Sequence, residues 1–396
     1  MIEDAINGDS TAAAPLDGAS IPEPRLADAT AGEQRHFARA FALIEEAIGQ
    51  QIFPGAALAV ASHGQLLACH AFGRFTYDPA SPEVRPETLW DLASLTKPIG
   101  TVSMAMLLFE RGRLSLEAPV AEILPQFADA WGSDAWVAGE QRQWRRAVTV
   151  AMLLAHTSGL PAHRKLYLQV SGSEAVRTAA RRRPLQTPPG SCAVYSDIGF
   201  IVLGEVLERV AGEALDSFCQ REIFSPLKLN MSFTPHPSMW EQIPPTANDI
   251  AYRSRIIQGE VNDENASAMG GRAPHAGLFG DVLSVARFAE CLLRGGAPLF
   301  QPATVGLFTA RQPSPSGSSR TLGWDTPSQP SQSGQFFSAH SFGHLGYTGT
   351  SLWCDCERQL SVTLLTNRSW PDAANQAIKQ IRPALHDAII EALPEP

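Results

Sequence analysis

Strand-like apolar runs lie near both ends of this 396-residue chain, and helical patterns fill the long stretch between them. The runs Ala56–Ala61 and Leu66–Phe72, which flank a short polar turn, have the form of a β-hairpin. Strand patterns return only late, at Thr321–Asp325, Ser341–Tyr347, Thr350–Asp355 and Gln359–Thr366. Strands so far apart in sequence share one sheet if the segment between them is an insertion. We therefore expect an α/β (α+β) fold, in which an antiparallel sheet flanked by helices carries an inserted, mainly helical domain.

The length favours more than one folding unit, since a single core seldom grows beyond ~250–300 residues. Residues 1–34, which are acidic and rich in Ala, Gly and Pro, predict a disordered tail. We expect a split α/β domain at 35–100 and 300–396, and a mainly helical domain at 101–299. Helical spacing begins at Phe37, Phe41, Ile44 and Ile48. The further predicted helices are 96–111, 148–155, 173–182, 197–211, 214–223, 281–294 and 372–393, the last with a second segment starting at Pro383. Residues 312–341, rich in Ser, Pro, Gly and Gln, are expected to form a mobile loop.

The charge balance limits the partners that the chain can have. It contains 31 Lys and Arg against 40 Asp and Glu, a net charge of −9 with neutral His, which disfavours a nucleic-acid or anionic-membrane partner. No apolar run approaches the ~18 residues of a membrane span, and the start lacks the basic and apolar regions of a signal peptide. As written, the sequence predicts a cytoplasmic protein; a misassigned or trimmed start would allow export. The oligomeric state stays open.

Several common site motifs are missing from the sequence. It contains neither C-x-x-C nor H-E-x-x-H, so a zinc site has little support, and its six cysteines are too few for a disulfide scaffold in so long a chain. The G-x-S-x-G elbow of α/β-hydrolases and the phosphate loop G-x-x-x-x-G-K-[ST] are also missing. We therefore expect no metal and no cofactor.

The spacing S-x-x-K occurs twice, and its context separates the two copies. Ser94 and Lys97 precede a long apolar helical pattern, so we expect them one turn apart on the same face, at a helix N-terminus whose free N–H groups suit an oxyanion. Ser225 and Lys228 follow a helix end and include Pro226, which predicts a structural loop. A serine hydroxyl needs a neighbouring base to become a nucleophile, and a lysine can supply it. On spacing alone, a buried structural lysine paired with a carboxylate explains Lys97 equally well.

Two later segments favour the catalytic interpretation. Tyr195-Ser196-Asp197 opens a predicted helix, and His344-Leu345-Gly346-Tyr347 lies on a late strand pattern. In order and spacing, the three motifs resemble those of the serine β-lactamase and penicillin-binding-protein superfamily: S-x-x-K, then Y-x-N or Y-S-D, then [KH]-T-G. They are most similar to class C enzymes and the related D-Ala carboxypeptidases and esterases. The resemblance covers about residues 37–390 and includes the accessory segments Phe53–Gly55, Leu153–Leu160, Val261–Ala266 and His275–Phe279.

The resemblance implies a role for each matching residue. Ser94 would be the nucleophile, Lys97 would share its proton, and Tyr195 would be the phenolic base or proton shuttle. The backbone N–H groups of Ser94 and Tyr347 would form the oxyanion hole. The residues expected to contact the substrate are Asp197, His344, Gly346 and His275, and Asp197 would also steady Lys97.

Departures from the family pattern at positions 197, 262 and 345 affect the expected chemistry, and Asn262 stands where related sequences have His. Asp197 stands where many relatives have Asn, and its charge should raise the pKa of Lys97 and shift base duty to Tyr195. Leu345 replaces a Thr whose hydroxyl often binds a substrate carboxylate, and His344, with a reference pKa near ~6.5, is mostly neutral at pH 7. The motif therefore predicts a less cationic site that favours neutral esters over penicillins.

The sequence thus predicts a serine hydrolase that forms an acyl-enzyme on Ser94. Its substrate would be a small molecule or cell-wall peptide: an ester, a D-amino-acid peptide or a β-lactam. Two alternatives stay open. One is a penicillin-binding sensor that is acylated without turnover, and the other is an acyltransferase that passes the acyl group to an alcohol or amine.

Overall fold

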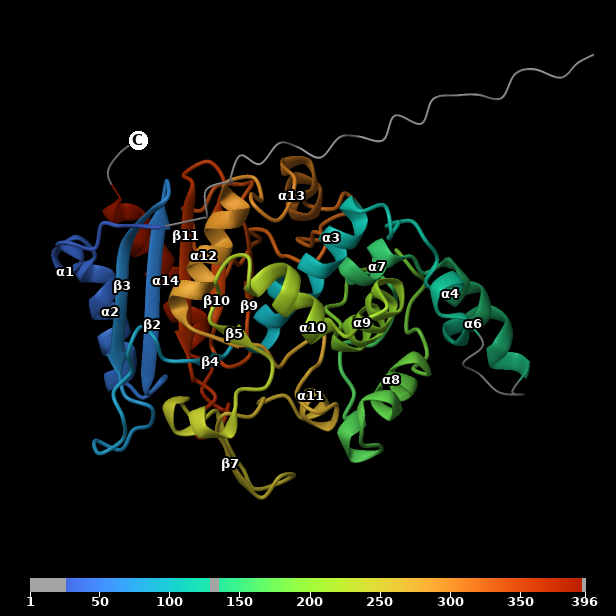
Figure 1. Ribbon diagram of the computed structural model, residues 1–396, viewed down its shortest axis with the longest axis horizontal. Coiled ribbons are helices and arrows are strands. Elements are labelled where there is room, and N and C mark those ends of the chain that lie inside the picture. The colour runs from blue at the N-terminus through green and yellow to red at the C-terminus, as the bar shows by residue number, and fades with distance from the viewer. Residues whose placement is uncertain (1–25, 129–134, 394–396) are drawn as a thin grey trace, which may run out of the picture.

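The structure is a computed structural model that describes residues 26–128 and 135–393. Its main sheet has the strand order β1-β3-β2-β11-β10-β9 (Figure 1). These strands are β1 (Ala27–Asp28), β2 (Gly55–Ser62), β3 (Gln65–Gly73), β9 (Phe342–Leu345), β10 (Ser351–Asp355) and β11 (Leu360–Thr366). All neighbours pair antiparallel except β1 and β3, which pair parallel. The expected antiparallel sheet built from both ends of the chain is confirmed, since β2 pairs along its length with β11.

Helices cover both faces of this sheet. The helices α2 (Ala38–Gly49) and α14 (Ile378–Ala392) pack on the face that carries Leu58 and Val60 of β2. The helix α12 (Val282–Leu293) packs on the opposite face, where β2 presents Ala57 and Ala59. Because successive side chains of a strand point to opposite faces, β2 is buried on both sides and reads as a continuous apolar run.

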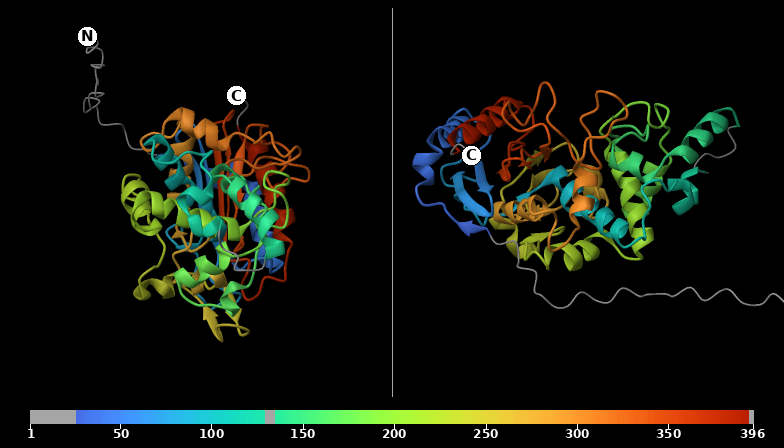
Figure 2. Two further views of the ribbon diagram at one scale, coloured as in Figure 1. Left: turned by 90° about the vertical axis from the view of Figure 1, so that its right-hand side faces the viewer. Right: turned by 90° about the horizontal axis from the view of Figure 1, so that it is seen from above.

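The central part of the chain is mainly helical, as expected. Figures 1 and 2 show that α4, α6 and α8 lie far from α2, at the other end of the molecule. The remaining helices are α1 (Glu33–His36), α3 (Ser103–Glu110), α4 (Val120–Ile123), α5 (Pro125–Ala128), α6 (Ala135–Ala147), α7 (Val150–Leu154), α8 (Ser173–Arg181), α9 (Asp197–Ala211), α10 (Leu215–Cys219), α11 (Glu264–Ala268) and α13 (Pro302–Thr309). The short strands form a sheet β4-β8-β5 (Trp90–Asp91, Phe279–Gly280, Met231–Ser232) and a hairpin β6-β7 (Ala247–Asp249, Arg255–Ile257).

Three expectations are corrected. The tail predicted at 1–34 is ordered from residue 26, where β1 joins the sheet edge; residues 1–25 lie outside the described part. Thr321–Asp325 forms only isolated bridges, from Asp325 to Arg320 and to Gly343. The helix α12 lies inside the range 101–299 yet packs on the main sheet.

The closing helix also differs from the prediction. It begins at Ile378 and runs through Pro383 without a break. A proline inside a helix leaves the carbonyl four residues earlier without its N–H donor. Here that carbonyl belongs to Lys379, and the side chain of Gln332 donates a hydrogen bond to it at 3.0 Å. The helix therefore continues because a distant side chain satisfies the orphan group.

Candidate active site

The candidate nucleophile lies in a tight turn between β4 and α3. Ser94 belongs to a 3₁₀ turn, Ala93–Leu95, and is followed by a π-helical segment, Lys97–Val102, that runs into α3. The α-helix expected here therefore starts later, although the expected contact is present: Lys97 Nζ lies 3.0 Å from Ser94 Oγ. Ala93 has a φ of +48°, a region that a residue with a Cβ rarely adopts. The strained backbone of Ala93 therefore directly precedes the candidate nucleophile, Ser94.

Lys97 is fully buried, and its ammonium group makes two hydrogen bonds and one ion pair. Nζ lies 2.8 Å from Asp197 Oδ1 and donates to Ser94 Oγ and, at 3.1 Å, to the carbonyl of His275. Burial acts to lower the pKa of Lys97, but Asp197 and Tyr195 outweigh it and the pKa is raised. Burial acts to raise the pKa of Asp197, but Lys97 and His163 hold it well below its usual range. The resting site therefore contains an ammonium–carboxylate pair, as the aspartate in the second motif predicted.

The second motif reaches the nucleophile from the start of α9. Ser196 caps this helix by accepting the N–H of Gly199 at 2.8 Å, and it donates to the carbonyl of Pro161 at 2.7 Å. The preceding Tyr195 places its ring 4.7 Å from Lys97 Nζ. Burial raises the pKa of Tyr195, and its interactions with Lys97 and Ser94 only partly oppose this. The phenol therefore carries its proton at neutral pH.

The third motif is tied directly to the strand that precedes the nucleophile. The hydroxyls of Thr348 and Thr350 donate to the carbonyls of Asp91 (2.8 Å) and Leu92 (3.0 Å). A Cβ on Gly346 would lie 2.8 Å from the Leu92 carbonyl and 1.9 Å from the Thr350 hydroxyl, so only glycine permits this approach. The backbone N–H of Tyr347 makes no hydrogen bond within residues 26–128 and 135–393. It is free for the predicted oxyanion role.

His344 is neutral, and an arginine that we did not expect lies beside it. The side chain is buried, with Nδ1 donating to the Leu345 carbonyl at 2.9 Å; burial, Lys97 and Arg320 lower its pKa well below the usual value. Arg320 reaches the site from the loop 312–341. Its guanidinium lies 5.1 Å from the centre of the Tyr195 ring and 3.6 Å from Asp325. Arg320 therefore supplies a positive charge in the site that the third motif did not predict.

Two histidines lie on the other side of Asp197. His275 is only 1% exposed, and its Nε2 contacts Asp263 Oδ1 at 2.9 Å. Because its side chain is buried, direct substrate binding by His275 stays a prediction, whereas its carbonyl clearly holds Lys97. His163, which the sequence analysis missed, places Nδ1 3.7 Å from Asp197 Oδ2, and this contact raises its pKa.

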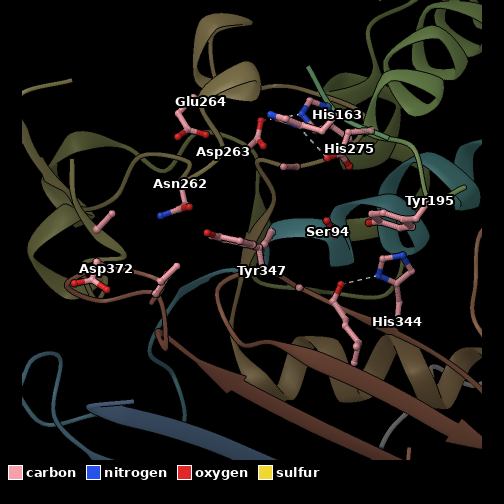
Figure 3. Close-up of a pocket in the computed structure, with 18 of the residues that line it drawn as sticks. Ser94, His163, Tyr195, Asn262, Asp263, Glu264, His275, His344, Tyr347 and Asp372 are labelled. Carbon is pink, nitrogen blue, oxygen red and sulfur yellow. Dashed lines mark hydrogen bonds and ion pairs between the residues drawn. The ribbon is translucent and has the colours of Figure 1, made fainter. Parts of the chain in front are cut away.

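These motifs converge on one cavity of about 690 Å³ (Figure 3). The predicted site residues that line it are Ser94, Tyr195, Asp197, His275, His344, Gly346 and Tyr347, and Lys97 lies buried behind them. Ser225 and Lys228 are exposed elsewhere, which confirms that the second S-x-x-K is a surface loop. In the described part of the chain, no three His, Cys, Asp or Glu side chains converge as a metal site. None of the described helices is long and apolar enough to cross a membrane.

Asp91 is a further residue that the sequence analysis missed. It is buried under the nucleophile turn, where its two carboxylate oxygens accept the N–H groups of Ala93 (2.8 Å) and Asn262 (2.6 Å). Burial raises the pKa of Asp91 to about 6, although both N–H donors oppose the shift. A protonated carboxyl group is a weaker hydrogen-bond acceptor than a carboxylate. Its O–H group would also face a backbone N–H, which is a donor and cannot accept it. The strained turn at Ala93 is therefore best held when Asp91 is ionised.

We expect kcat to fall as the pH drops through about 6, because protonation of Asp91 loosens this turn. Asp91→Asn should lower kcat at all pH values and remove the acidic limb. The measurement is the pH profile of kcat from pH 5 to 8, with His163→Gln as the matched control because the pKa of His163 is also raised. If the fall in kcat at low pH persists in Asp91→Asn and disappears in His163→Gln, the titrating group is His163 and not Asp91.

Comparison with known proteins agrees with the geometry. The family model described as Beta-lactamase matches residues 40–385. The chain is 31% identical over 352 residues to an N-acetylmuramyl-L-alanine amidase of Bacillus subtilis, covering 80% of this chain and 77% of the relative. It is 28% identical over 322 residues to a putative D-alanyl-D-alanine carboxypeptidase of Salmonella typhimurium, covering 74% and 72%.

Solved structures share the fold. EstCE1, a hydrolase with promiscuous acyltransferase activity, superposes with a TM-score of 0.71 at 23% identity, covering 89% of this chain and 99% of that one. A penicillin-binding protein homolog from Caulobacter crescentus gives a TM-score of 0.69 at 21% identity, covering 90% and 98%. Identities this low speak for the fold alone. With the family model matching most of its length, the chain belongs to the β-lactamase family, within the serine β-lactamase and penicillin-binding-protein superfamily.

Proposed function

We propose that this protein is a serine hydrolase that cleaves an amide bond through an acyl-enzyme on Ser94. The observation that carries the proposal is the position of Tyr195, whose ring lies 4.7 Å from Lys97 Nζ and beside Ser94, in a buried setting that raises its pKa and so keeps its proton in place. An amine leaves an acyl group only when its nitrogen is protonated, whereas an activated ester needs no such help. A phenol that retains its proton suits the amide. The names of two relatives, an N-acetylmuramyl-L-alanine amidase and a D-alanyl-D-alanine carboxypeptidase, also describe amide hydrolysis at an alanine.

In the proposed acylation, Tyr195 acts as a proton relay. Ser94 Oγ attacks the amide carbon and gives its proton to the Tyr195 oxygen, while Tyr195 passes its own proton to the departing nitrogen. The C–N bond breaks, the free amine leaves, and Tyr195 is again neutral. Lys97 stays an ammonium group that stabilises the negative charge developing on Ser94 Oγ. The N–H groups of Ser94 and Tyr347 receive the carbonyl oxyanion.

Deacylation would run the same relay with water in place of the amine. Water attacks the ester carbon of the acyl-enzyme and gives a proton to Tyr195, and Tyr195 returns its proton to Ser94 Oγ as the C–O bond breaks. The products are a free carboxylic acid and the original enzyme. No cofactor is needed for either half of this reaction.

A panel of four substrates tests the proposal: N-acetylmuramyl-L-alanine, a peptide ending in D-Ala-D-Ala, a neutral p-nitrophenyl ester and a penicillin. We expect release of a free amine from at least one amide, with a transient acyl group on the Ser94 peptide detected by mass spectrometry. Turnover of the ester without either amide would contradict the proposal and support the preference predicted from Leu345. An adduct that persists for hours would indicate a penicillin-binding sensor. Transfer to an added alcohol or amine in preference to water would indicate an acyltransferase.

A further inference from the structure

The ring of Tyr347 is exposed inside the candidate active site. It is 57% exposed and lines the cavity, although most large aromatic rings in this protein are buried. In Figure 3 the side chain extends from the neighbourhood of Ser94 toward Asp372, and Ser94 lies between Tyr347 and Tyr195. An aromatic side chain that projects into a cavity is typical of a ligand contact, because tyrosine offers a large apolar surface with a polar end.

A buried arginine holds this ring in place. The guanidinium of Arg368 lies 4.6 Å from the centre of the Tyr347 ring, and its Nε donates to the Tyr347 carbonyl at 2.8 Å. Its Nη1 donates to the Ala373 carbonyl at 3.3 Å, and it makes no ion pair with any residue that the structure describes. Burial lowers the pKa of Arg368, so the site accepts an electrostatic penalty to keep a cation there. A ring fixed in this way loses little conformational entropy when a ligand covers it.

Polar groups line the cavity into which the Tyr347 ring projects, among them two asparagines. Asn262 is held through its backbone, which donates to Asp91 and accepts from Arg253 at 2.7 Å, and Asn248 donates its N–H to the Pro371 carbonyl at 2.8 Å. Both asparagines line the cavity, and neither side-chain amide has a hydrogen-bond partner among the described residues. These amides offer donors and acceptors without charge. The same cavity is also lined by charged side chains, those of Asp249, Arg253, Glu264 and Asp372. An apolar platform in a cavity rich in hydrogen-bonding groups suits a hydroxylated ring better than a purely apolar group.

We propose that the acyl part of the substrate carries a sugar ring, and that this ring packs on Tyr347 while Asn248 and Asn262 bind its hydroxyl or acetamido groups. The orientation follows from the proposed function, on which this inference rests: Tyr195 protonates the leaving amine, so the amine lies on the Tyr195 side of Ser94 and the acyl part lies on the Tyr347 side. The C–H face of a pyranose covers the tyrosine, and its substituents point outward to the amides.

Two substrates with the same scissile amide test the inference: N-acetylmuramyl-L-alanine and D-lactyl-L-alanine, which lacks the sugar. The wild type should show a higher kcat/KM for the sugar-bearing substrate. Tyr347→Ala should reduce the ratio of the two kcat/KM values by about tenfold, as expected for loss of one stacking contact. Tyr347→Phe, which keeps the ring, should retain the ratio. The backbone N–H at position 347 is present in all three proteins, so the ratio separates the ring from the oxyanion hole.

The outcomes separate this inference from the proposed function. If both amides are cleaved with the same kcat/KM, or if the ratio is unchanged in Tyr347→Ala, the sugar subsite is wrong and the amidase activity stands. If phenylacetyl-L-alanine is cleaved in preference to the sugar-bearing amide, the ring binds an aromatic acyl group and the inference is likewise overturned. If neither sugar-bearing nor sugar-free amide is cleaved and Ser94 acquires no acyl group, the proposed function fails as well.

Discussion

Ser94→Ala is expected to lower the turnover of any acyl substrate by at least about 10⁴-fold and to abolish covalent labelling. The oxygen that would bond to the acyl carbon is lost, whereas the cavity, Lys97 and Tyr195 stay in place. Removal of a serine nucleophile from a preorganised site leaves only the catalysis that binding and the oxyanion hole provide. The substitution deletes one acceptor of the buried Lys97 ammonium group, so the melting temperature should fall modestly, while the contacts with Asp197 and the His275 carbonyl keep the lysine in place. Activity and melting temperature measured together separate lost chemistry from lost folding.

The matched control is Ser225→Ala, because Ser225 has the same S-x-x-K spacing but is exposed outside the cavity. This variant should keep wild-type activity and wild-type labelling. An activated phosphonate or acyl probe followed by peptide mass spectrometry identifies the modified residue. Label on a peptide other than the one containing Ser94, or turnover that survives in Ser94→Ala, would disprove the assignment of the nucleophile.

Lys97→Met and Tyr195→Phe should each lose at least about 10²-fold in kcat/KM, and the double variant should lose little more. The two side chains interact directly, with Nζ 4.7 Å from the ring centre, and each affects the pKa of the other. Groups that handle one proton as a unit fail together, so their losses are not additive. The measurement is a double-mutant cycle on the substrate that the wild type turns over fastest.

Protein stability provides the control for this cycle. Lys97→Met leaves the Asp197 carboxylate without its cation, so this variant should also be less stable than the wild type. Tyr195→Phe should keep wild-type stability. Lys228→Met, from the second S-x-x-K, should keep wild-type activity, because Lys228 lies outside the cavity. Fully additive losses in the double variant would mean that the two residues act independently.

Since the pKa values of Lys97 and Tyr195 are both raised, wild-type activity should not decline as the pH rises from 7 to 9.

Much of the fold could be predicted from the sequence, because strand and helix periodicity report local burial. The hairpin of β2 and β3, the late strands β9, β10 and β11, and the helix Asp197–Ala211 all formed where the pattern placed them. The failures occurred where distant contacts override local preference. Pro383 lies inside a helix because Gln332 satisfies the carbonyl that it leaves open. Thr321–Asp325 has a strand-like composition, but only Asp325 pairs with the strand β9.

The candidate site divides in the same way. The sequence by itself determined which side chains are the candidates for catalysis, because Ser94, Lys97, Tyr195 and His344 belong to short motifs whose spacing is local. Only the tertiary structure decided their protonation and their neighbours. Asp91, His163 and Arg320 belong to no motif and reach the site from three separate segments, so no local pattern could reveal them. Burial and electrostatic contacts arise only when those segments pack together, and they leave Lys97 charged, Tyr195 protonated and His344 neutral.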